Sequence, residues 1–239
     1  MRLFTRLDVK NNNIIKPINF EGLRKVGKPL PMAKKYYEEG IDEILFMDAV
    51  ASLYNRKNLF NIIKQATKNI FRPITIGGGI KSLKDVKNCL LSGADKVAIN
   101  SAFVKNINLL SEMVKIYGSS TIISYIETKK INGNWLVFFN NGKENSGINL
   151  LDWIYKVQNF GCGEILLTSI DKDGTLKGCD YELLNLVYKK IKVPLIYSGG
   201  CKNIEDVKKF KKKYPQTALS ISSLLHYDLE KISDIKKNI

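Results

Sequence analysis

Eight short apolar runs recur along this chain of 239 residues and constrain its fold more than any other feature. Each is rich in isoleucine, leucine, valine or phenylalanine, as is typical of strands buried on both faces of a parallel sheet. They span residues 2–8, 43–48, 73–77, 96–100, 121–127, 164–169, 194–199 and 218–222. Segments with helical periodicity lie between most of them, and two of these segments end at Gly40 and Gly93, as helices commonly do at glycine. This alternation, without a linker, predicts an α/β fold, a single (β/α)8 barrel domain over residues 1–239.

An internal repeat supports the barrel. The segment "GGGIKSLKDVK" (77–87) is similar to "SGGCKNIEDVK" (198–208), at an offset of 121 residues. Earlier in each half, "RLDVK" (6–10) corresponds to "YIETK" (125–129), at an offset of 119 residues. The chain is therefore interpreted as two related half-barrels of four βα units each.

Two acids occupy matching positions in this repeat. Asp8 ends the first predicted strand and Glu127 ends the fifth. Strands one and five of an eight-stranded barrel lie across from each other, and barrel enzymes react at the carboxyl ends of their strands. Asp8 and Glu127 are therefore candidate catalytic residues, one as general base and one as general acid, if their surroundings separate their pKa values. The alternative for Asp8 is a turn-capping role, because "DVKNNNIIK" is turn-like.

Glycine-rich loops follow the third and seventh predicted strands, as "GGGIKS" (77–82) and "SGGCKN" (198–203). Glycine lets backbone N–H groups approach an anion, and a helix N-terminus favours negative charge. With the polar residues after the next strand in each half, the candidate phosphate-binding residues are Gly78, Gly79, Asn100, Ser101, Gly199, Gly200, Ser222 and Ser223. We expect two phosphate sites on opposite sides of the mouth, and hence an elongated ligand with a phosphate at each end. The alternative is that these glycines serve tight turns alone.

A third polar loop follows the sixth predicted strand, in "EILLTSIDKDGTLKG" (164–178). Thr168 lies at the end of the strand, and Asp173 and Gly174 follow in the loop. A hydroxyl, a carboxylate and a glycine that exposes the backbone suit substrate positioning, although an Asx-type turn would use the same residues. Asp48 ends the second predicted strand as a further strand-end acid.

Charge and cysteine content limit the other classes of function. The net charge of +15 is spread along the chain, so a nucleic-acid partner is not expected. The chain has one histidine, His226, and four cysteines without a CxxC spacing, Cys89, Cys162, Cys179 and Cys201. We expect buried reduced thiols and no metal or cofactor. No apolar run is long enough for a membrane span and no signal-peptide pattern is present, so a cytoplasmic protein is expected.

Together these segments resemble the cyclase subunit of imidazole glycerol phosphate synthase, a (β/α)8-barrel family of histidine biosynthesis. The resemblance runs from about residue 2 to residue 230 and is carried by "LDVKNNNIIKPINFEGLRKVGKP", "DEILFMDAVAS", "PITIGGGIKS", "GADKVAINSA", "GCGEILLTSIDKDGT" and "YSGG". It implies a cyclase that takes ammonia from a glutaminase subunit. The implied substrate is the bis-phosphorylated phosphoribulosyl-formimino-aminoimidazole carboxamide ribotide, and the products are imidazole glycerol phosphate and aminoimidazole carboxamide ribotide.

The resemblance also implies roles for individual residues. Asp8 and Glu127 fall on the two catalytic acids of the family. The substrate-contacting positions of the family fall on Lys16, Asp48, Asn100, Thr168, Asp173 and Ser198. In this family the glutaminase docks at the N-terminal face of the barrel, forming a heterodimer, and ammonia enters through a ring of charged residues. That ring falls on Arg2, Glu43, Lys96 and Glu164, each at the start of a predicted strand.

Several residues differ from the usual pattern of the family. Glu127 stands where aspartate is usual, small residues are usual at Arg6 and Tyr125, and "SLYNRKN" (52–58) also departs. Arg6 lies two residues before Asp8 and so shares its inward face. It is expected either to pair with one of the acids and lower its pKa, or to obstruct the ammonia path.

Two functions therefore stay open from the sequence. The first is a working cyclase, in which Asp8 and Glu127 catalyse ammonia addition and ring closure. The second is a paralogue whose barrel conducts ammonia for an amidotransferase that modifies nucleotide sugars or surface glycans, which the departures around both acids favour. The sugar isomerase of the same pathway and a basic non-enzymatic binding protein are more distant alternatives.

Overall fold

A computed structural model of the chain describes residues 1–49 and 53–239, and within these it leaves out the side chains of Leu23 and residues 53–58. The end of "DEILFMDAVAS" and the first residue of "SLYNRKN" thus lie outside the described residues. No described helix is long and apolar enough to cross a lipid bilayer.

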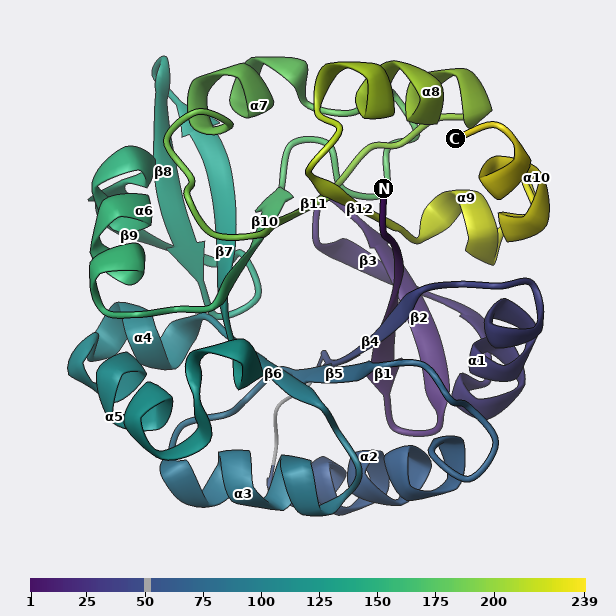
Figure 1. Cartoon of the computed structure of the whole chain (residues 1–239), viewed down its shortest axis with the longest axis horizontal. Helices are drawn as coiled ribbons and strands as arrows, with labels where there is room; N and C mark the ends of the chain where they lie inside the picture. The colour runs from purple at the N-terminus through teal and green to yellow at the C-terminus, as the bar shows by residue number, and fades with distance from the viewer. Residues whose placement is uncertain (50–52) are drawn as a thin grey trace.

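Eight parallel strands close into a barrel, which confirms the predicted (β/α)8 architecture (Figure 1). Around the barrel they are β1 (Leu3–Lys10), β4 (Glu43–Asp48), β5 (Ile74–Gly77), β6 (Lys96–Ile99), β7 (Ile122–Ile131), β10 (Glu164–Ser169), β11 (Leu195–Ser198) and β12 (Ala218–Ile221). The pairing of β12 with β1 closes the sheet. Each strand coincides with one of the eight apolar runs, apart from differences at the ends.

Helices form the outer layer of the barrel (Figure 1). They are α1 (Pro29–Glu38), α2 (Leu53–Ala66), α3 (Leu83–Leu91), α4 (Ser101–Lys105), α5 (Asn108–Tyr117), α6 (Leu150–Asn159), α7 (Tyr181–Val187), α8 (Ile204–Lys213), α9 (Ser223–His226) and α10 (Ile232–Lys237), with a 3-10 turn at Ser119–Thr121. The repeat is visible in their caps. Ser82 accepts a hydrogen bond from the Asp85 N–H at the start of α3, and its counterpart Asn203 accepts one from the Asp206 N–H at the start of α8.

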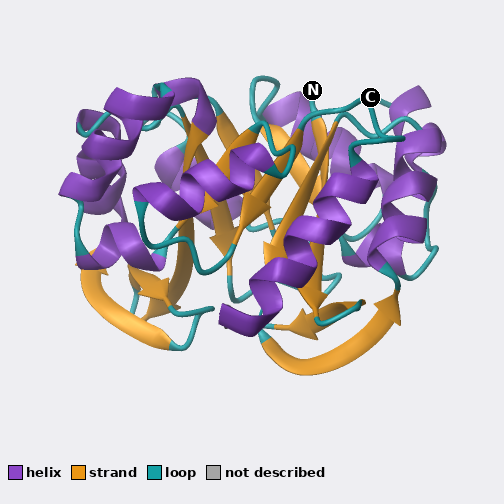
Figure 2. Cartoon of the chain, turned by 90° about the horizontal axis from the view of Figure 1, so that it is seen from below, coloured by secondary structure: helices purple, strands orange, loops and turns teal. Residues whose placement is uncertain are grey.

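Two hairpins that the sequence did not predict extend the sheet. They consist of β2 (Asn13–Ile18) with β3 (Glu21–Gly27), and β8 (Asn134–Phe139) with β9 (Glu144–Asn149). The strands β1 and β7 run on past the two acids and pair antiparallel with β2 and β8. The acids thus lie inside strands rather than at their ends, and the turn comes only at Asn11, which has a φ of 55°. Both hairpins lie at the edge of the barrel opposite to the N-terminus (Figure 2).

The hydrophobic core has two parts. The larger part lies between the barrel and the helices. The smaller part fills the inside of the barrel and consists of Phe4, Leu45, Met47, Ala98, Ile123, Tyr125, Leu166, Ile196 and Ala218. The interior is therefore a packed core between the two ends of the barrel, as expected for this fold.

Candidate active site at the barrel mouth

Asp8 is tied to a buried arginine inside the barrel. Its Oδ1 accepts a hydrogen bond of 2.8 Å from Nε of Arg6, and the exposed fractions of the two residues are 2% and 6%. Nη1 of Arg6 donates to the Tyr125 hydroxyl at 2.7 Å. The guanidinium also lies 5.4 Å from the centroids of both the Phe20 and the Tyr125 rings. The structure thus contains the expected pairing of Arg6 with Asp8.

The second oxygen of Asp8 is placed differently. Oδ2 is buried, and it has no hydrogen-bond partner among the described residues. A buried carboxylate oxygen without a partner is costly unless a ligand or water binds it. Asp8 can therefore receive a ligand through Oδ2 while Oδ1 stays bound to Arg6.

Glu127 has a different environment. Its Oε2 accepts a hydrogen bond of 2.8 Å from the N–H of Gly142, in the turn between β8 and β9, and the residue is 2% exposed. Burial raises the pKa of Glu127 to about 7, although the charge of Arg6 opposes this rise. Arg6 lowers the pKa of Glu127, as expected, but desolvation raises this pKa by more. A carboxyl group that changes protonation state near neutral pH suits general acid–base catalysis.

A first cavity opens beside Glu127, with a volume of about 180 Å³. Its walls include the predicted phosphate-binding residues of the first half-barrel together with the acid, namely Gly78, Gly79, Asn100, Ser101 and Glu127. Gly78 has a φ of +91°, and a Cβ there would lie 2.3 Å from the carbonyl oxygen of Asp48. Only glycine fits this approach, which exposes the backbone of the loop to the cavity.

Polar side chains of the first cavity are fixed by the β8–β9 hairpin. Nδ2 of Asn100 donates to the carbonyl oxygen of Phe138 at 3.0 Å, and Oγ of Ser101 accepts from the N–H of Asn140 at 3.0 Å. Oδ1 of Asn100 is buried without a partner among the described residues. The hairpin thus orients the polar wall of this cavity.

A second, tighter cavity lies on the other side of the mouth and has a volume of about 20 Å³, room for about one water. Its lining contains a second set of the predicted site residues, namely Lys16, Asp173, Gly174, Ser198, Gly199, Gly200, Ser222 and Ser223. Nζ of Lys16 lies 3.0 Å from both carboxylate oxygens of Asp173. This buried ion pair balances the lysine charge inside the cavity.

The last two predicted substrate residues, Thr168 and Asp48, are both buried. Thr168 on β10 lies between Glu127 and Ser198 in the strand register, and these two neighbours line the first and the second cavity, respectively. Asp48 ends β4 and lies opposite Val9 of β1.

Residues that sequence reasoning missed close the mouth. The Asn19 N–H donates to the Asp173 carbonyl oxygen at 2.8 Å, which lays the β2–β3 turn against the loop after β10. Phe20 in the same turn covers Arg6, and a Cβ on Gly142 would lie 2.4 Å from the Phe20 ring. No local sequence pattern predicts these contacts, because they join segments that are far apart in the chain.

His226 supports Arg6 from the side of the helices. Its Nε2 lies 3.0 Å from the Arg6 carbonyl oxygen, and its Nδ1 lies 2.8 Å from the Tyr36 hydroxyl. Burial lowers the pKa of His226 to about 3, so this ring is neutral at physiological pH. We therefore regard it as a structural residue that fixes β1.

The four charged residues expected at the opposite end of the barrel form a closed ring, which we call the rim ring (Arg2, Glu43, Lys96 and Glu164). Arg2 donates to Glu43 at 2.6 Å and also pairs with Glu164. Nζ of Lys96 lies 3.0 Å from Glu43 and 3.1 Å from Glu164. Arg2, Lys96 and Glu164 also line a cavity of about 810 Å³ on this face.

Known proteins are similar to this chain over most of its length. A family profile described as "Histidine biosynthesis protein" matches residues 2–230. Three similar relatives are each described as "Imidazole glycerol phosphate synthase subunit HisF". The protein from Legionella pneumophila is 48% identical over 86% of this chain and 98% of its own length. Those from Clostridium botulinum and Sulfolobus acidocaldarius are each 42% identical over 99% of this chain and 94% of their own length. The chain therefore belongs to the histidine biosynthesis protein family and, within it, to the HisF subunits of imidazole glycerol phosphate synthase.

Proposed function

We propose that this chain is the cyclase subunit of imidazole glycerol phosphate synthase. It combines ammonia with phosphoribulosyl-formimino-aminoimidazole carboxamide ribotide and yields imidazole glycerol phosphate and aminoimidazole carboxamide ribotide. The observation that carries the proposal is one mouth in which two cavities, each bordered by a glycine-rich loop, flank two buried acids. A substrate with a phosphate at each end matches that arrangement.

The two acids have different roles in the proposed reaction. Ammonia addition and ring closure need a group that accepts a proton from nitrogen and one that returns a proton to a leaving atom. Glu127, with a pKa of about 7, has both protonation states available at neutral pH. Asp8 keeps Oδ1 on Arg6 and offers Oδ2 to the substrate. We assign Glu127 as the proton carrier and Asp8 as the residue that orients and stabilises a developing positive charge.

Binding of the substrate ends involves the remaining mouth residues. The backbone of Gly78 and Gly79, with Asn100 and Ser101, would hold one phosphate. On the other side, Gly199, Gly200 and the hydroxyls of the second cavity would hold the other. Because the Lys16–Asp173 pair and the Phe20 turn narrow that side, we expect the β2–β3 hairpin to shift when substrate enters.

Ammonia would come from a glutaminase subunit in a cytoplasmic heterodimer. The wide cavity and the rim ring on the N-terminal face favour docking there. From the rim ring, the route to the acids passes Phe4, whose ring lies 5.3 Å from the Arg2 guanidinium, and then the Arg6–Tyr125 pair. Ammonia can therefore pass only if side chains move both at Phe4 and at the Arg6–Tyr125 pair.

The direct test uses the purified chain with the bis-phosphorylated substrate and an excess of ammonium salt at pH above 8, followed by chromatography of the products. We expect imidazole glycerol phosphate from the native protein. Glu127→Gln should lose about 100-fold or more in kcat, as expected for removal of a general acid–base group. Asp8→Asn should lose a similar factor, about 100-fold, because it removes the charge that stabilises the developing positive charge. Absence of product from a protein that binds the substrate would overturn the proposal.

One observation favours a second candidate function, a helper that conducts ammonia for an amidotransferase acting on nucleotide sugars or surface glycans. Arg6 engages Asp8 while the rim ring is complete, which fits a barrel that keeps an entry for ammonia and has an altered reaction side. Cyclase activity that is absent in the native chain and gained in an Arg6→Cys/Glu127→Asp variant would favour this helper. If the native chain has cyclase activity and this double substitution lowers it, the result would favour the cyclase.

A further inference from the structure

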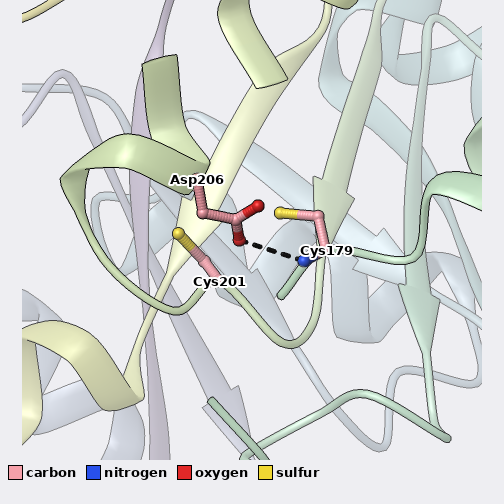
Figure 3. A group of neighbouring side chains, drawn as sticks. All are labelled: Cys179, Cys201 and Asp206. Atoms are coloured by element: carbon pink, nitrogen blue, oxygen red, sulfur yellow. Dashed lines mark hydrogen bonds between the residues drawn. The ribbon is translucent and has the colours of Figure 1, made fainter. Parts of the chain in front are cut away.

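Three potential metal ligands converge behind the second cavity (Figure 3). Cys179 lies in the loop between β10 and α7, Cys201 follows the glycine-rich loop after β11, and Asp206 lies in the first turn of α8. The two sulfur atoms and a carboxylate oxygen lie within 4.8 Å of one another. Both thiols are free, and the two cysteines are 5% and 7% exposed. In Figure 3 the Cys179 sulfur and the Asp206 carboxylate point toward each other, and the Cys201 side chain lies beside Asp206.

Hydrogen bonds fix these ligands before any ion binds. The Gly178 N–H donates to the Gly200 carbonyl oxygen at 2.8 Å, which aligns the residues just before the two cysteines. Oδ2 of Asp206 accepts from the Cys179 N–H at 3.0 Å, and Oδ1 accepts from the Tyr181 hydroxyl at 2.7 Å. Ligating carboxylates in metal sites are oriented by outer hydrogen bonds of this kind. Oδ2 also accepts from the Lys202 N–H, whereas Oδ1 accepts from the Tyr181 hydroxyl and keeps a second lone pair for a cation.

The repeat separates the role of the acid from that of the thiols. In the first half-barrel, Asp85 corresponds to Asp206, and its Oδ2 accepts from the Lys81 N–H at 2.9 Å. Asp206 makes the same bond to the Lys202 N–H at 3.2 Å, so loop and helix capping explains an acid in both halves. It does not explain the cysteines, because Ile80 stands where Cys201 would be.

We propose that Cys179, Cys201 and Asp206 form a binding site for a thiophilic divalent cation of the zinc class, with water as the fourth ligand. Two thiolates and one carboxylate are a donor set that Zn²⁺ prefers and that Mg²⁺ and Ca²⁺ do not. On binding, each cysteine gives its proton to solvent and no electrons are exchanged, so the site releases two protons. The site then carries a net negative charge. Nζ of Lys209 lies 4.4 Å from the ring centroid of Tyr181, whose hydroxyl donates to Asp206.

We expect binding of the metal ion to depend on pH and to stiffen the second cavity. Metal affinity should fall steeply as pH decreases, because protons compete for the sulfur atoms. The ion would join the loop after β10 to the loop that carries Gly199 and Gly200, both of which border the second cavity. Metal binding would thereby stiffen one end of the ligand site.

The test is a titration of tag-free, reduced and chelator-treated protein with Co²⁺ at pH 8. We expect thiolate-to-cobalt charge-transfer absorption that saturates at one ion per chain and is displaced by Zn²⁺. Cys179→Ser and Cys201→Ser should each abolish the band, and Asp206→Asn should weaken binding at least roughly tenfold, as loss of one ligand commonly does. Cys162→Ser is the matched control, because Cys162 is also a buried free thiol but lies outside the cluster, and this variant should bind as the native protein does.

X-ray absorption on the zinc-loaded native protein needs no variant and guards against misfolding of the serine substitutions. Two sulfur neighbours at about 2.3 Å and nitrogen or oxygen neighbours at about 2.0 Å would support the site. A zinc environment without sulfur, or cobalt absorption that survives both serine substitutions, would overturn the proposal.

Discussion

The guanidinium of Arg6 lies 2.8 Å from the carboxylate of Asp8, inside the barrel and two residues away on the same strand. The same guanidinium reaches Tyr125 on β7, across the barrel interior. One side chain therefore links the two half-barrels at the level of the two acids, and its charge opposes the rise in the pKa of Glu127.

Breaking this pair should be costly. Arg6→Met leaves the buried Asp8 carboxylate without its cation, so the free energy of unfolding should fall by about 3–5 kcal/mol. Urea denaturation at pH 7 measures the change. Arg72→Met, at an exposed arginine, should change stability by less than about 0.5 kcal/mol. Arg6→Met/Asp8→Asn should recover part of the loss, and a double variant no better than the single one would contradict a pairing role.

Glu127 should make stability depend on pH in an unusual direction. Its pKa rises from 4.5 to about 7 on folding, so between these values only the folded protein holds the proton. The free energy of unfolding should therefore fall as pH rises through this window, by up to about 1.4 kcal/mol per pH unit, and stay level above it. Glu127→Gln, which stays neutral, should lack this contribution.

The measurement is the difference in unfolding free energy between the native chain and Glu127→Gln from pH 4.5 to 8. Subtraction removes the opposite contribution of His226, whose lowered pKa makes stability rise with pH in both proteins. Glu112→Gln, at an exposed glutamate, is the control and should give a flat difference. A flat difference for Glu127→Gln as well would show that this acid is ionised throughout.

Gly78, which lines the first cavity, should tolerate no side chain. Gly78 and Gly40 have similar backbone conformations, with φ of +91° and +94°, but a Cβ meets backbone within 2.3 Å only at Gly78. Gly40→Ala should therefore cost about 1–2 kcal/mol from strain alone. Gly78→Ala should cost about 1–3 kcal/mol more through the clash with Asp48. Thermal unfolding of both variants compares the costs, and equal effects would mean that the loop simply moves aside.

The rim ring should affect the use of glutamine more than the use of ammonium. Glu164→Gln removes one acid that pairs with both Arg2 and Lys96 and leaves the ring with excess positive charge. In the complex with a glutaminase, the ratio of glutamine-driven to ammonium-driven turnover should fall roughly tenfold, a change of about 1.4 kcal/mol in the barrier. Glu182→Gln, in an exposed pair with Lys130, should leave the ratio unchanged. An unchanged ratio for Glu164→Gln would show that the rim ring does not contribute to the delivery of ammonia.

Local sequence predicted the eight barrel strands because each is a short run rich in apolar residues, buried on both faces of the sheet. It did not predict the hairpins β2–β3 and β8–β9, whose strands mix exposed and buried residues. The glycine-rich loops were foreseen because glycine and polar residues recur in both halves. The partner of Arg6 was left open, since arginine at that position reaches several acids.

The sequence by itself determined the closed barrel, its two-fold internal repeat and the shared edge on which its polar residues gather. Those features follow from periodicities that act over a few residues and from the parallel arrangement of the strands. Only the tertiary structure decided that Arg6 binds Asp8, that desolvation outweighs Arg6 at Glu127, and that Cys179, Cys201 and Asp206 meet. Each of these depends on burial and on the distances between segments that pack together only after the barrel closes.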